Sequence, residues 1–356
     1  MGVLSQELPI SRGVFRTRLS APFCARCRIL CELETVMTFV TLGLSQPVLQ
    51  ALALKGYDSP TPIQTQAIPT VLTGRDLLGI AQTGTGKTAA FMLPSIDRLV
   101  ASDQRPKPRS CRMLILAPTR ELAGQIAESA REYAHFAHLK VVTVFGGTSV
   151  GRNKQELARG VDVCVATPGR LVDLAEQRAI DLSSVEILVL DEADQMLDLG
   201  FIHALKQIVR LLPKQRQTLF FSATMPNAIR QLADQYLTNP AQVSVAPQAT
   251  TADRVEQKVA FCQNTEKQAF LTILLREGFA SKEMDRVLVF TRTKHGADRV
   301  VKKLAQVGIR ANAIHGNKSQ PQREKALGEF RQGTARILIA TDIAARGIDV
   351  SGISHV

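Results

Sequence analysis

The chain has 356 residues, of which 45% are hydrophobic, and it carries a formal net charge of +12 at pH 7. That length suffices for two domains of ordinary size with packed cores. No apolar run reaches the ~20 residues that a membrane-spanning helix needs, so we expect a soluble protein. We predict a cytoplasmic location, because the later cysteines are typical of free thiols in a reducing compartment. The positive charge favours a polyanionic partner, although many basic proteins bind none, and an aromatic content of 5% without Trp argues against base stacking as the main contact with nucleic acid.

Residues 1–36 differ in composition from the rest of the chain and are predicted to be a disordered extension. Their charged residues are five arginines and three glutamates, with no lysine or aspartate. An organellar transit peptide and translation from upstream of a start at Met37 are the alternatives. Three cysteines here have a C-x2-C-x3-C spacing that could bind a metal, but no fourth ligand is evident nearby: Cys24, Cys27 and Cys31. The remaining cysteines are expected to be buried free thiols: Cys111, Cys164 and Cys262.

The stretch Ala81–Thr88, with the sequence AQTGTGKT, has the spacing of a phosphate-binding P-loop. It follows the apolar run Asp76–Ile80, which is expected to be a strand, and it precedes a helical pattern that starts at Ala89. Ala81 stands where the strict pattern has Gly, and a glycine-rich turn that merely caps a βα unit is the alternative. The groups expected to contact a nucleotide are the backbone of Thr83, Gly84, Thr85 and Gly86, the Lys87 amine at the β- and γ-phosphates, and the Thr88 hydroxyl at a Mg²⁺ ion.

Strand and helix patterns alternate on both sides of this loop. Upstream, a helix is expected over Ser45–Lys55, and a proline-stiffened turn leads to a second helix near Ile63. Downstream, near-continuous apolar runs are typical of parallel strands that are covered on both faces. These runs are Met113–Ala117, Val141–Phe145, Val161–Ala166, Glu186–Leu190 and Gln217–Phe221. Each run ends in small, polar or charged residues, and because ligands bind beyond the carboxyl ends of such strands, these endings define one candidate site.

The patterns lapse near Pro240, which divides the chain into two α/β domains. We predict a first domain over residues 37–239, a flexible linker over 240–254 and a second domain over 255–356. Strands of the second domain are expected at Val255–Cys262, Arg286–Phe290, Arg310–Ile314 and Arg336–Ala340, with helices at His295–Val307 and Pro321–Arg331. The predicted fold class is therefore α/β, with two parallel sheets, of which the second is incomplete.

Asp191 and Glu192 follow the wholly apolar strand that ends at Leu190. One carboxylate after such a strand is the usual partner of a P-loop Thr in holding magnesium, and we assign this role to Asp191, through water. Glu192 is assigned as the general base that orients the attacking water. The alternative, a pair of solvated acids at a strand end, is weakened by the P-loop upstream.

In their order and spacing, these motifs resemble the DEAD-box family of ATP-dependent RNA helicases, and among them the bacterial RhlE-like subgroup. The resemblance covers roughly Phe39–Val356, and Ala81 is usual in the family. It implies two RecA-like domains, with ATP and Mg²⁺ as cofactors and RNA as a partner that is bound with little sequence specificity. The segments that carry it are Gly56–Gln64, Ala81–Thr88, Pro118–Ala123, Gly146–Gly147, Thr167–Arg170, Asp191–Asp194, Ser222–Thr224, Val289–Thr293, Gln320–Arg323 and Thr341–Asp349.

The resemblance also implies roles for individual residues. Gln64 would read the adenine edge, Phe39 would stack on the base, and Tyr57 belongs to the same nucleotide site. Asp349 would contact the ribose, with Gly347 near the γ-phosphate. The implied RNA path consists of Pro118, Thr119, Arg120, Gly147, Thr167, Gly169 and Arg170 in the first domain and Thr291, Gln320, Arg323 and Thr341 in the second. Coupling between the domains is assigned to Asp194, Ser222, Thr224 and Arg346.

The resemblance implies local separation of RNA strands as the two domains close on ATP and RNA. Family members continue into a His-Arg-x-Gly-Arg-x-x-Arg segment, which supplies arginines to the γ-phosphate, and no such segment occurs in these 356 residues. We therefore expect a C-terminally truncated helicase with impaired hydrolysis, because an arginine finger is worth ~10³–10⁵ in rate. A nucleotide-gated RNA-binding protein is the alternative, and a DNA helicase or metabolic P-loop ATPase is a more distant one.

Overall fold

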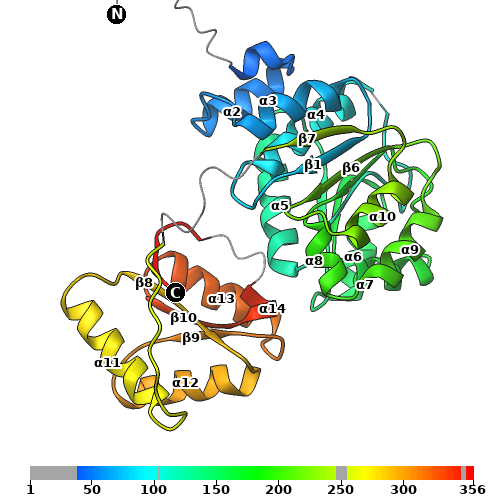
Figure 1. Cartoon of the computed structure of the whole chain (residues 1–356). Coiled ribbons are helices and arrows are strands. Elements are labelled where there is room, and N and C mark those ends of the chain that lie inside the picture. The colour runs from blue at the N-terminus through cyan, green and yellow to red at the C-terminus, as the bar shows by residue number, and fades with distance from the viewer. Residues whose placement is uncertain (1–37, 103, 246–254, 346–349) are drawn as a thin grey trace, which may run out of the picture. The chain divides into compact units, whose positions relative to one another are not determined.

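The computed structural model describes residues 38–102, 104–245, 255–345 and 350–356, and it contains two sheets whose strand pairs are all parallel (Figure 1). We call residues 38–245 the first lobe and residues 255–356 the second lobe. Parallel sheets with intervening helices confirm the predicted α/β class. The expectations for residues 1–36 and their three cysteines lie outside the described residues. None of the described helices is both long and apolar enough to cross a bilayer.

The sheet of the first lobe has seven strands in the order β3-β4-β2-β5-β6-β1-β7. Their bounds are β1 Leu77–Ile80, β2 Cys111–Leu116, β3 Val141–Val144, β4 Val161–Ala166, β5 Ile187–Leu190, β6 Gln217–Ser222 and β7 Ala241–Ser244. Apart from β7, every strand lies within two residues of a predicted apolar run. All residues of β2, β5 and β6 are buried, because both faces of the sheet are covered by helices.

Two sets of helices enclose this sheet. One set is η1 Phe39–Leu42, α2 Gln46–Leu54, α3 Pro62–Leu72, α4 Lys87–Ala101 and α5 Arg120–Tyr133; the other is α6 Val150–Leu157, α7 Pro168–Glu176, α8 Ala193–Asp198, α9 Ile202–Leu211 and α10 Asn227–Tyr236. Successive strand residues alternate between the two cores, with Ile187 and Val189 in one and Leu188 and Leu190 in the other. This packing fixes the strand ends that carry the candidate site.

β7 is a correction to the predicted domain boundary. Ala241–Ser244 falls within the range expected to be a linker, but it pairs in parallel with β1, where Leu77 faces Ala241 and Ile80 faces Ser244. Only Val243 of this edge strand is buried, so its sequence shows no apolar run that would predict a strand. Apart from Pro240 and Val245, the rest of the predicted linker lies outside the described residues.

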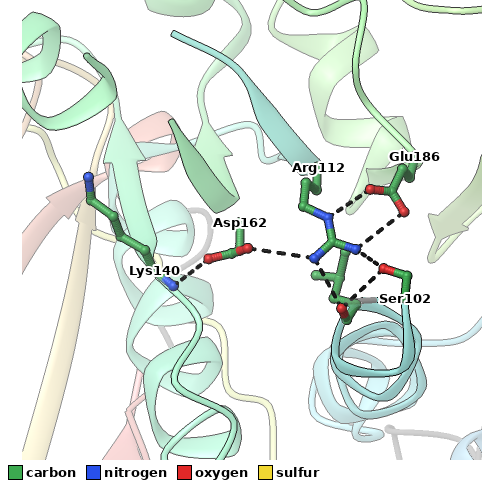
Figure 2. A network of polar contacts seen from close by, with 6 residues as sticks. Ser102, Arg112, Lys140, Asp162 and Glu186 are labelled. Atoms are coloured by element: carbon green, nitrogen blue, oxygen red, sulfur yellow. Dashed lines mark hydrogen bonds and ion pairs between the residues drawn. The ribbon is translucent and has the colours of Figure 1, made fainter. Parts of the chain in front are cut away.

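The buried side chain of Arg112, near the start of β2, contacts residues at the starts of β4 and β5 (Figure 2). This end of the sheet is opposite to the carboxyl ends of the strands, where the candidate site lies. Arg112 is 3% exposed, and its Nε donates to Glu186 Oε1 at 2.7 Å while its Nη1 donates to the Leu99 carbonyl at 3.0 Å. Arg112 Nη1 also lies 3.7 Å from Asp162 Oδ1, and the other oxygen of Asp162 accepts from the Lys140 backbone N–H. A buried charge of this kind is tolerated because its hydrogen bonds are made.

The second lobe contains a four-stranded sheet in the order β11-β8-β10-β9. Its elements are α11 Lys267–Ala280, β8 Arg286–Thr291, α12 Lys294–Gln306, β9 Asn312–Ile314, α13 Gln320–Arg331, β10 Ile337–Thr341, α14 Asp342–Ala345 and β11 Ile353–His355. The strand predicted at Val255–Cys262 is absent: the segment is assigned no strand, and Phe261 is 97% exposed. The segment ends in the apolar run Val259–Cys262, but no described strand pairs with it. Cys262 is exposed, whereas Cys111 and Cys164 are buried as predicted.

Candidate nucleotide and RNA site

The P-loop connects β1 to α4 as predicted. Gly84 has φ +83° and Gly86 has φ +92°, a left-handed backbone that favours glycine and leads directly into the helix at Lys87. The first turn of this 15-residue helix contains no acidic side chain. Its N-terminal N–H groups and the positive end of its dipole therefore face a position that suits a phosphate group.

Three charged groups are buried beside this loop. Lys87 is 5% exposed, and Asp191 and Glu192 are each 2% exposed at the end of β5. Within the described part of the chain, the Lys87 Nζ, Asp191 Oδ1 and Glu192 Oε2 atoms have no hydrogen-bond partner. Burial raises the pKa of both carboxyl groups; the Lys87 charge opposes this for both, and Asp191 adds to it for Glu192. Buried charged atoms without partners are the arrangement expected of a site that a ligand completes.

Glu192 is held in a strained backbone conformation and is bonded to the P-loop. Its φ of +54° is uncommon for a residue other than Gly, Asn or Asp and costs on the order of 1 kcal/mol. Its Oε1 accepts a hydrogen bond from the Thr83 hydroxyl at 3.1 Å. The proposed base is thus fixed in position relative to the loop that would hold the phosphates.

The donor set at this point fits a Mg²⁺ ion that arrives with phosphates. Asp191 provides a buried oxygen without a partner, and Thr88 lies half-buried in the first turn of α4. The described residues contain no group of three or more His, Cys, Asp or Glu that could hold a metal ion by themselves. Mg²⁺ is commonly bound through one or two carboxylates plus substrate phosphates and waters, so Thr88 and Asp191 suffice.

Gln64 lies against the P-loop. It is 3% exposed; its Nε2 donates to the Gly86 carbonyl at 3.1 Å, and its Oε1 accepts from the Thr61 N–H at 2.9 Å. The Thr61 hydroxyl in turn donates to the Thr85 carbonyl at 2.9 Å. The amide of Gln64 keeps one N–H and one lone pair for an adenine edge. Sequence analysis missed Thr61, although Thr followed by Gln three residues later is the pattern of a capping box.

The position of Phe39 contradicts the predicted stacking on the base. Phe39 is 4% exposed and packs in the core beside Leu42, because a side chain without a polar group is most stable there. Tyr57 is 39% exposed instead, and it lines a hollow of about 540 Å³ together with Gln64 and Lys87. That volume is in the range of small-molecule sites. The aromatic ring that a base can reach is therefore Tyr57, the ring of which also lies 6.4 Å from that of Tyr133.

The predicted RNA-contacting residues of the first lobe come together at the carboxyl ends of β2, β3 and β4. Pro118 and Thr119 lead from β2 into α5 at Arg120, and Thr167 and Gly169 follow β4 at the start of α7. A Cβ on Gly147 would lie 2.6 Å from Arg120 Nη1, so the glycine turn after β3 packs directly on that guanidinium. Arg170 Nη1 donates to the Thr148 carbonyl at 3.0 Å. Three segments that are distant in sequence thus meet at one place, which contains two arginines, Arg120 and Arg170.

The second lobe positions its predicted RNA-contacting residues in the same manner. Thr291 ends β8 and Thr341 ends β10, and the two residues face each other in the parallel register. The Thr291 hydroxyl lies 3.3 Å from the Thr293 carbonyl and 3.5 Å from that of Ala340. Gln320 and Arg323 lie in the first turn of α13, which follows β9. All four residues therefore lie at or just beyond the carboxyl ends of the strands.

The structure joins three of the residues assigned to coupling. Asp194 Oδ2 accepts hydrogen bonds from the Thr224 N–H at 3.0 Å and from its hydroxyl at 2.8 Å. The Ser222 hydroxyl donates to the Thr224 carbonyl at 2.7 Å. These bonds connect the end of β6 to α8, which starts directly after Glu192. Arg346, Gly347 and Asp349, which were assigned to coupling and to the nucleotide, lie outside the described residues.

Comparison with known proteins identifies the family of this chain. Residues 61–232 match the family described as DEAD/DEAH box helicase, and residues 265–356 match the helicase conserved C-terminal domain. The chain belongs to the DEAD-box helicase family, and its two lobes are the two RecA-like domains of those proteins. This confirms the predicted family and fold class.

Individual relatives agree with this assignment. RNA helicase CrhR of Synechocystis is 43% identical over 321 residues, which are 90% of this chain and 63% of that protein. The ATP-dependent RNA helicase CshA of Streptococcus pneumoniae is 40% identical over 320 residues, 90% of this chain and 59% of the relative. The chain thus spans about three-fifths of the length of these relatives.

Two solved structures have the same fold. S. cerevisiae Dbp5 bound to RNA and ADP BeF3 matches with a TM-score of 0.76 and 30% identity, over 89% of this chain and 78% of that one. A DEAD box protein from Methanococcus jannaschii matches with a TM-score of 0.55 and 36% identity, over 89% of this chain and 83% of that one.

Proposed function

We propose that this chain is the core of an ATP-dependent RNA helicase that separates short RNA duplexes locally, or remodels RNA–protein complexes, at the expense of ATP hydrolysis. The observation that supports this most strongly is the buried group of Lys87, Asp191 and Glu192 beside a well-formed P-loop. In this group, Lys87 Nζ, one Asp191 oxygen and Glu192 Oε2 have no hydrogen-bond partner among the described residues. The names of the relatives, which are RNA helicases, support RNA as the second ligand. We also propose the bacterial RhlE-like subgroup, on the motif order alone; a phylogenetic tree that places the chain elsewhere overturns this assignment.

The geometry supports the following proposed roles at the nucleotide. Tyr57 stacks on the base, and Gln64 reads the adenine edge with its remaining amide groups, which favours ATP over nucleotides that lack the matching groups. The backbone of Thr83–Gly86 cradles the phosphates, and Lys87 neutralises their charge. Mg²⁺, held by Thr88 and Asp191, would supply further charge neutralisation. Glu192 accepts the proton of the attacking water, and Gly347 and Asp349 retain the roles that the family resemblance implies.

The RNA roles follow from the chemistry of the two rims. Thr hydroxyls, glycine N–H groups and arginine guanidiniums bind phosphates without reading base edges, so we propose that sequence specificity is low. Contacts to 2′-hydroxyl groups would favour RNA over DNA. The hydrogen bonds that Thr224 donates to Asp194 link the carboxyl end of β5 directly to the end of β6. We propose that this link couples hydrolysis to RNA release. ATP and single-stranded RNA then each tighten the binding of the other.

We propose that the polypeptide 1–356 binds ATP but hydrolyses it slowly, because it contains no His-Arg-x-Gly-Arg-x-x-Arg segment. The test is steady-state ATPase activity, with and without single-stranded RNA, of this polypeptide and of one extended through that segment. The expected gain on extension is roughly 10³-fold or more, the scale of an arginine finger. Equal and rapid turnover by both polypeptides contradicts the requirement for the segment. If neither polypeptide turns over ATP but both retain nucleotide-dependent RNA binding, the result favours a nucleotide-gated RNA-binding protein. In a separate binding measurement, tighter binding of a DNA oligonucleotide of the same sequence contradicts the RNA assignment.

A further inference from the structure

A tight turn between β3 and α6 contacts Arg120 and Arg170 in the first lobe. Gly147 in this turn has φ +90°, and a Cβ on Gly146 or Gly147 would lie 3.0 or 2.6 Å from the Arg120 guanidinium. The turn therefore has little freedom to move without displacing Arg120. Whatever holds the turn in place also determines where a phosphate could contact it.

The buried side chain of Asn153, in α6, is hydrogen-bonded to Thr148 of this turn and to β3. It is 1% exposed, although Asn is mostly an exposed residue. Its Nδ2 donates to the Thr143 carbonyl on β3 at 3.1 Å, and its Oδ1 accepts from the Thr148 hydroxyl at 3.1 Å. The Thr143 carbonyl can only accept, which fixes the orientation of the amide. Both ends of this buried amide are thus used to tie the turn to the neighbouring strand and helix.

Thr148 also contacts Arg170 and so links Asn153 to this arginine. Its hydroxyl also lies 2.8 Å from the Phe145 carbonyl, so its one proton is shared between that carbonyl and Asn153 Oδ1. Its own carbonyl accepts from Arg170 Nη1 at 3.0 Å, and Arg170 Nε lies 3.8 Å from Asp173 Oδ2. The Arg170 side chain is 14% exposed and keeps donors of its planar fork for another ligand. An exposed arginine loses much rotamer freedom when it binds, whereas this one is already oriented.

The electrostatic surroundings indicate what that ligand is. Burial lowers the pKa of Arg120; the positive charge of Arg170 acts in the same direction, while the negative charge of Glu121 opposes it. Two guanidinium groups are therefore held within each other's field, at a cost that an anion between them would offset. A phosphate is the anion that matches the fork geometry of arginine.

We propose that Asn153 is a positioning residue for RNA: through Thr148 it holds Arg170 and the Gly146–Gly147 turn in the geometry that grips one backbone phosphate. This inference rests on the proposed RNA-binding function of the same rim. Asn153 and Thr148 do not themselves contact the phosphate. They hold Arg170 and the turn in the bound conformation before RNA arrives, which lowers the entropy cost of binding. Their loss therefore weakens RNA binding and leaves the nucleotide site intact.

The experiment compares Thr148→Val, which removes only the hydroxyl, with Thr148→Ser, which keeps it, and adds Asn153→Ala. Binding of a 5′-fluorescein decauridine RNA to the full chain is measured by anisotropy at several salt concentrations. Thr148→Val and Asn153→Ala should weaken binding roughly 5- to 30-fold, the effect of one or two lost hydrogen bonds, and Thr148→Ser should stay within about 2-fold. Loss of the phosphate contact should also reduce the salt slope by about 0.7, which a general loss of stability does not do.

A double-mutant cycle with Arg170→Gln tests the route of the effect. If Thr148 acts through Arg170, adding Thr148→Val to Arg170→Gln causes no further loss of RNA affinity. Additive losses, or a parallel fall in the affinity for a non-hydrolysable ATP analogue and in the melting temperature, overturn the proposal. If Asn153→Ala fails to fold, Thr148→Val decides the question. A wild-type chain that does not bind RNA contradicts the proposed function itself, whereas an effect of Arg170→Gln without one of Thr148→Val contradicts this inference alone.

Discussion

The two lobes share one architecture but differ in what they bury. The first lobe has seven strands and two cores that enclose Lys87, Asp191 and Glu192, each at most 5% exposed. The second lobe has four described strands, and apolar side chains remain exposed on α11, where Ile273 is 51% exposed. A large, rigid core can hold charged groups out of water at fixed positions, as hydrolysis requires. The first lobe is therefore suited to chemistry, and the second presents its candidate residues at a rim, as binding requires.

The difference in packing should appear first as a difference in stability. Phe221 is fully buried, its ring lies 5.5 Å from that of Phe91, and a Cβ on Gly79 would come within 2.5 Å of it. Phe221→Ala should cost about 3–5 kcal/mol, through lost transfer energy and a cavity. The matched change in the second lobe, Phe270→Ala, removes a ring that is 39% exposed and should cost roughly 1 kcal/mol or less.

Scanning calorimetry of both variants measures this, because it can resolve separate transitions of the two lobes. Similar losses in both variants would break the comparison. Such a result would mean that the exposed face of α11 is covered by protein in solution.

The difference in chemistry should appear next, in nucleotide affinity. Lys87→Ala removes a buried ammonium that has no partner among the described residues and that lies beside the P-loop. We expect the affinity for a fluorescent ATP analogue to fall about 100-fold, the loss of one strong charge-assisted contact. Lys302→Ala, at an exposed position of α12, is the control that lowers the net charge equally and should leave affinity unchanged. Nucleotide binding by Lys87→Ala within a few-fold of wild type contradicts the assigned site.

The contrast between the lobes also explains how far sequence reasoning reached. Strands such as β5 and β6 are buried on both faces, so each appears as a continuous apolar run that marks its own ends. The edge strand β7 has a single buried residue and gave no such signal, while Val255–Cys262 ends in an apolar run but pairs with no described strand. Register and pairing depend on neighbours that a linear pattern does not contain.

The candidate site divides in the same way. The P-loop and the acidic pair were predictable because fixed spacing determines their local geometry. Other features depend on which side chains pack nearby, and no local motif records that. They are the burial of Phe39, the two hydrogen bonds of the Gln64 amide to Thr61 and Gly86, and the proposed positioning role of Asn153. Tyr57 was predicted to belong to the site, but only its exposure beside the hollow distinguishes it from Phe39 as the stacking ring.

The smallest expected effect concerns the loss of folding stability that the buried charge of Glu192 causes. Burial raises the pKa of Glu192, so its ionised form is less favourable in the folded than in the unfolded chain. Between the unfolded and the folded pKa the native state binds more protons, and stability therefore falls as pH rises through this window. Glu192→Gln keeps the shape, removes the charge and should raise the melting temperature of the first lobe at pH 7 by a few degrees, equivalent to about 1 kcal/mol. Glu283→Gln, at an exposed position of the second lobe, should change nothing measurable.

The measurement is a series of melting curves from pH 7 down to pH 4, in EDTA and without nucleotide, so that no metal compensates the charge. The gain from Glu192→Gln should shrink as pH falls, because the wild-type carboxyl then becomes neutral as well. ATP binding should persist in this variant, while hydrolysis, measured in the polypeptide extended through the arginine segment, falls at least about 10²-fold, the scale of a lost general base. A constant gain at every pH would mean that relief of the buried charge is not its cause, and an unchanged or lower melting temperature at pH 7 would mean that the first lobe holds its catalytic carboxylate without cost to stability.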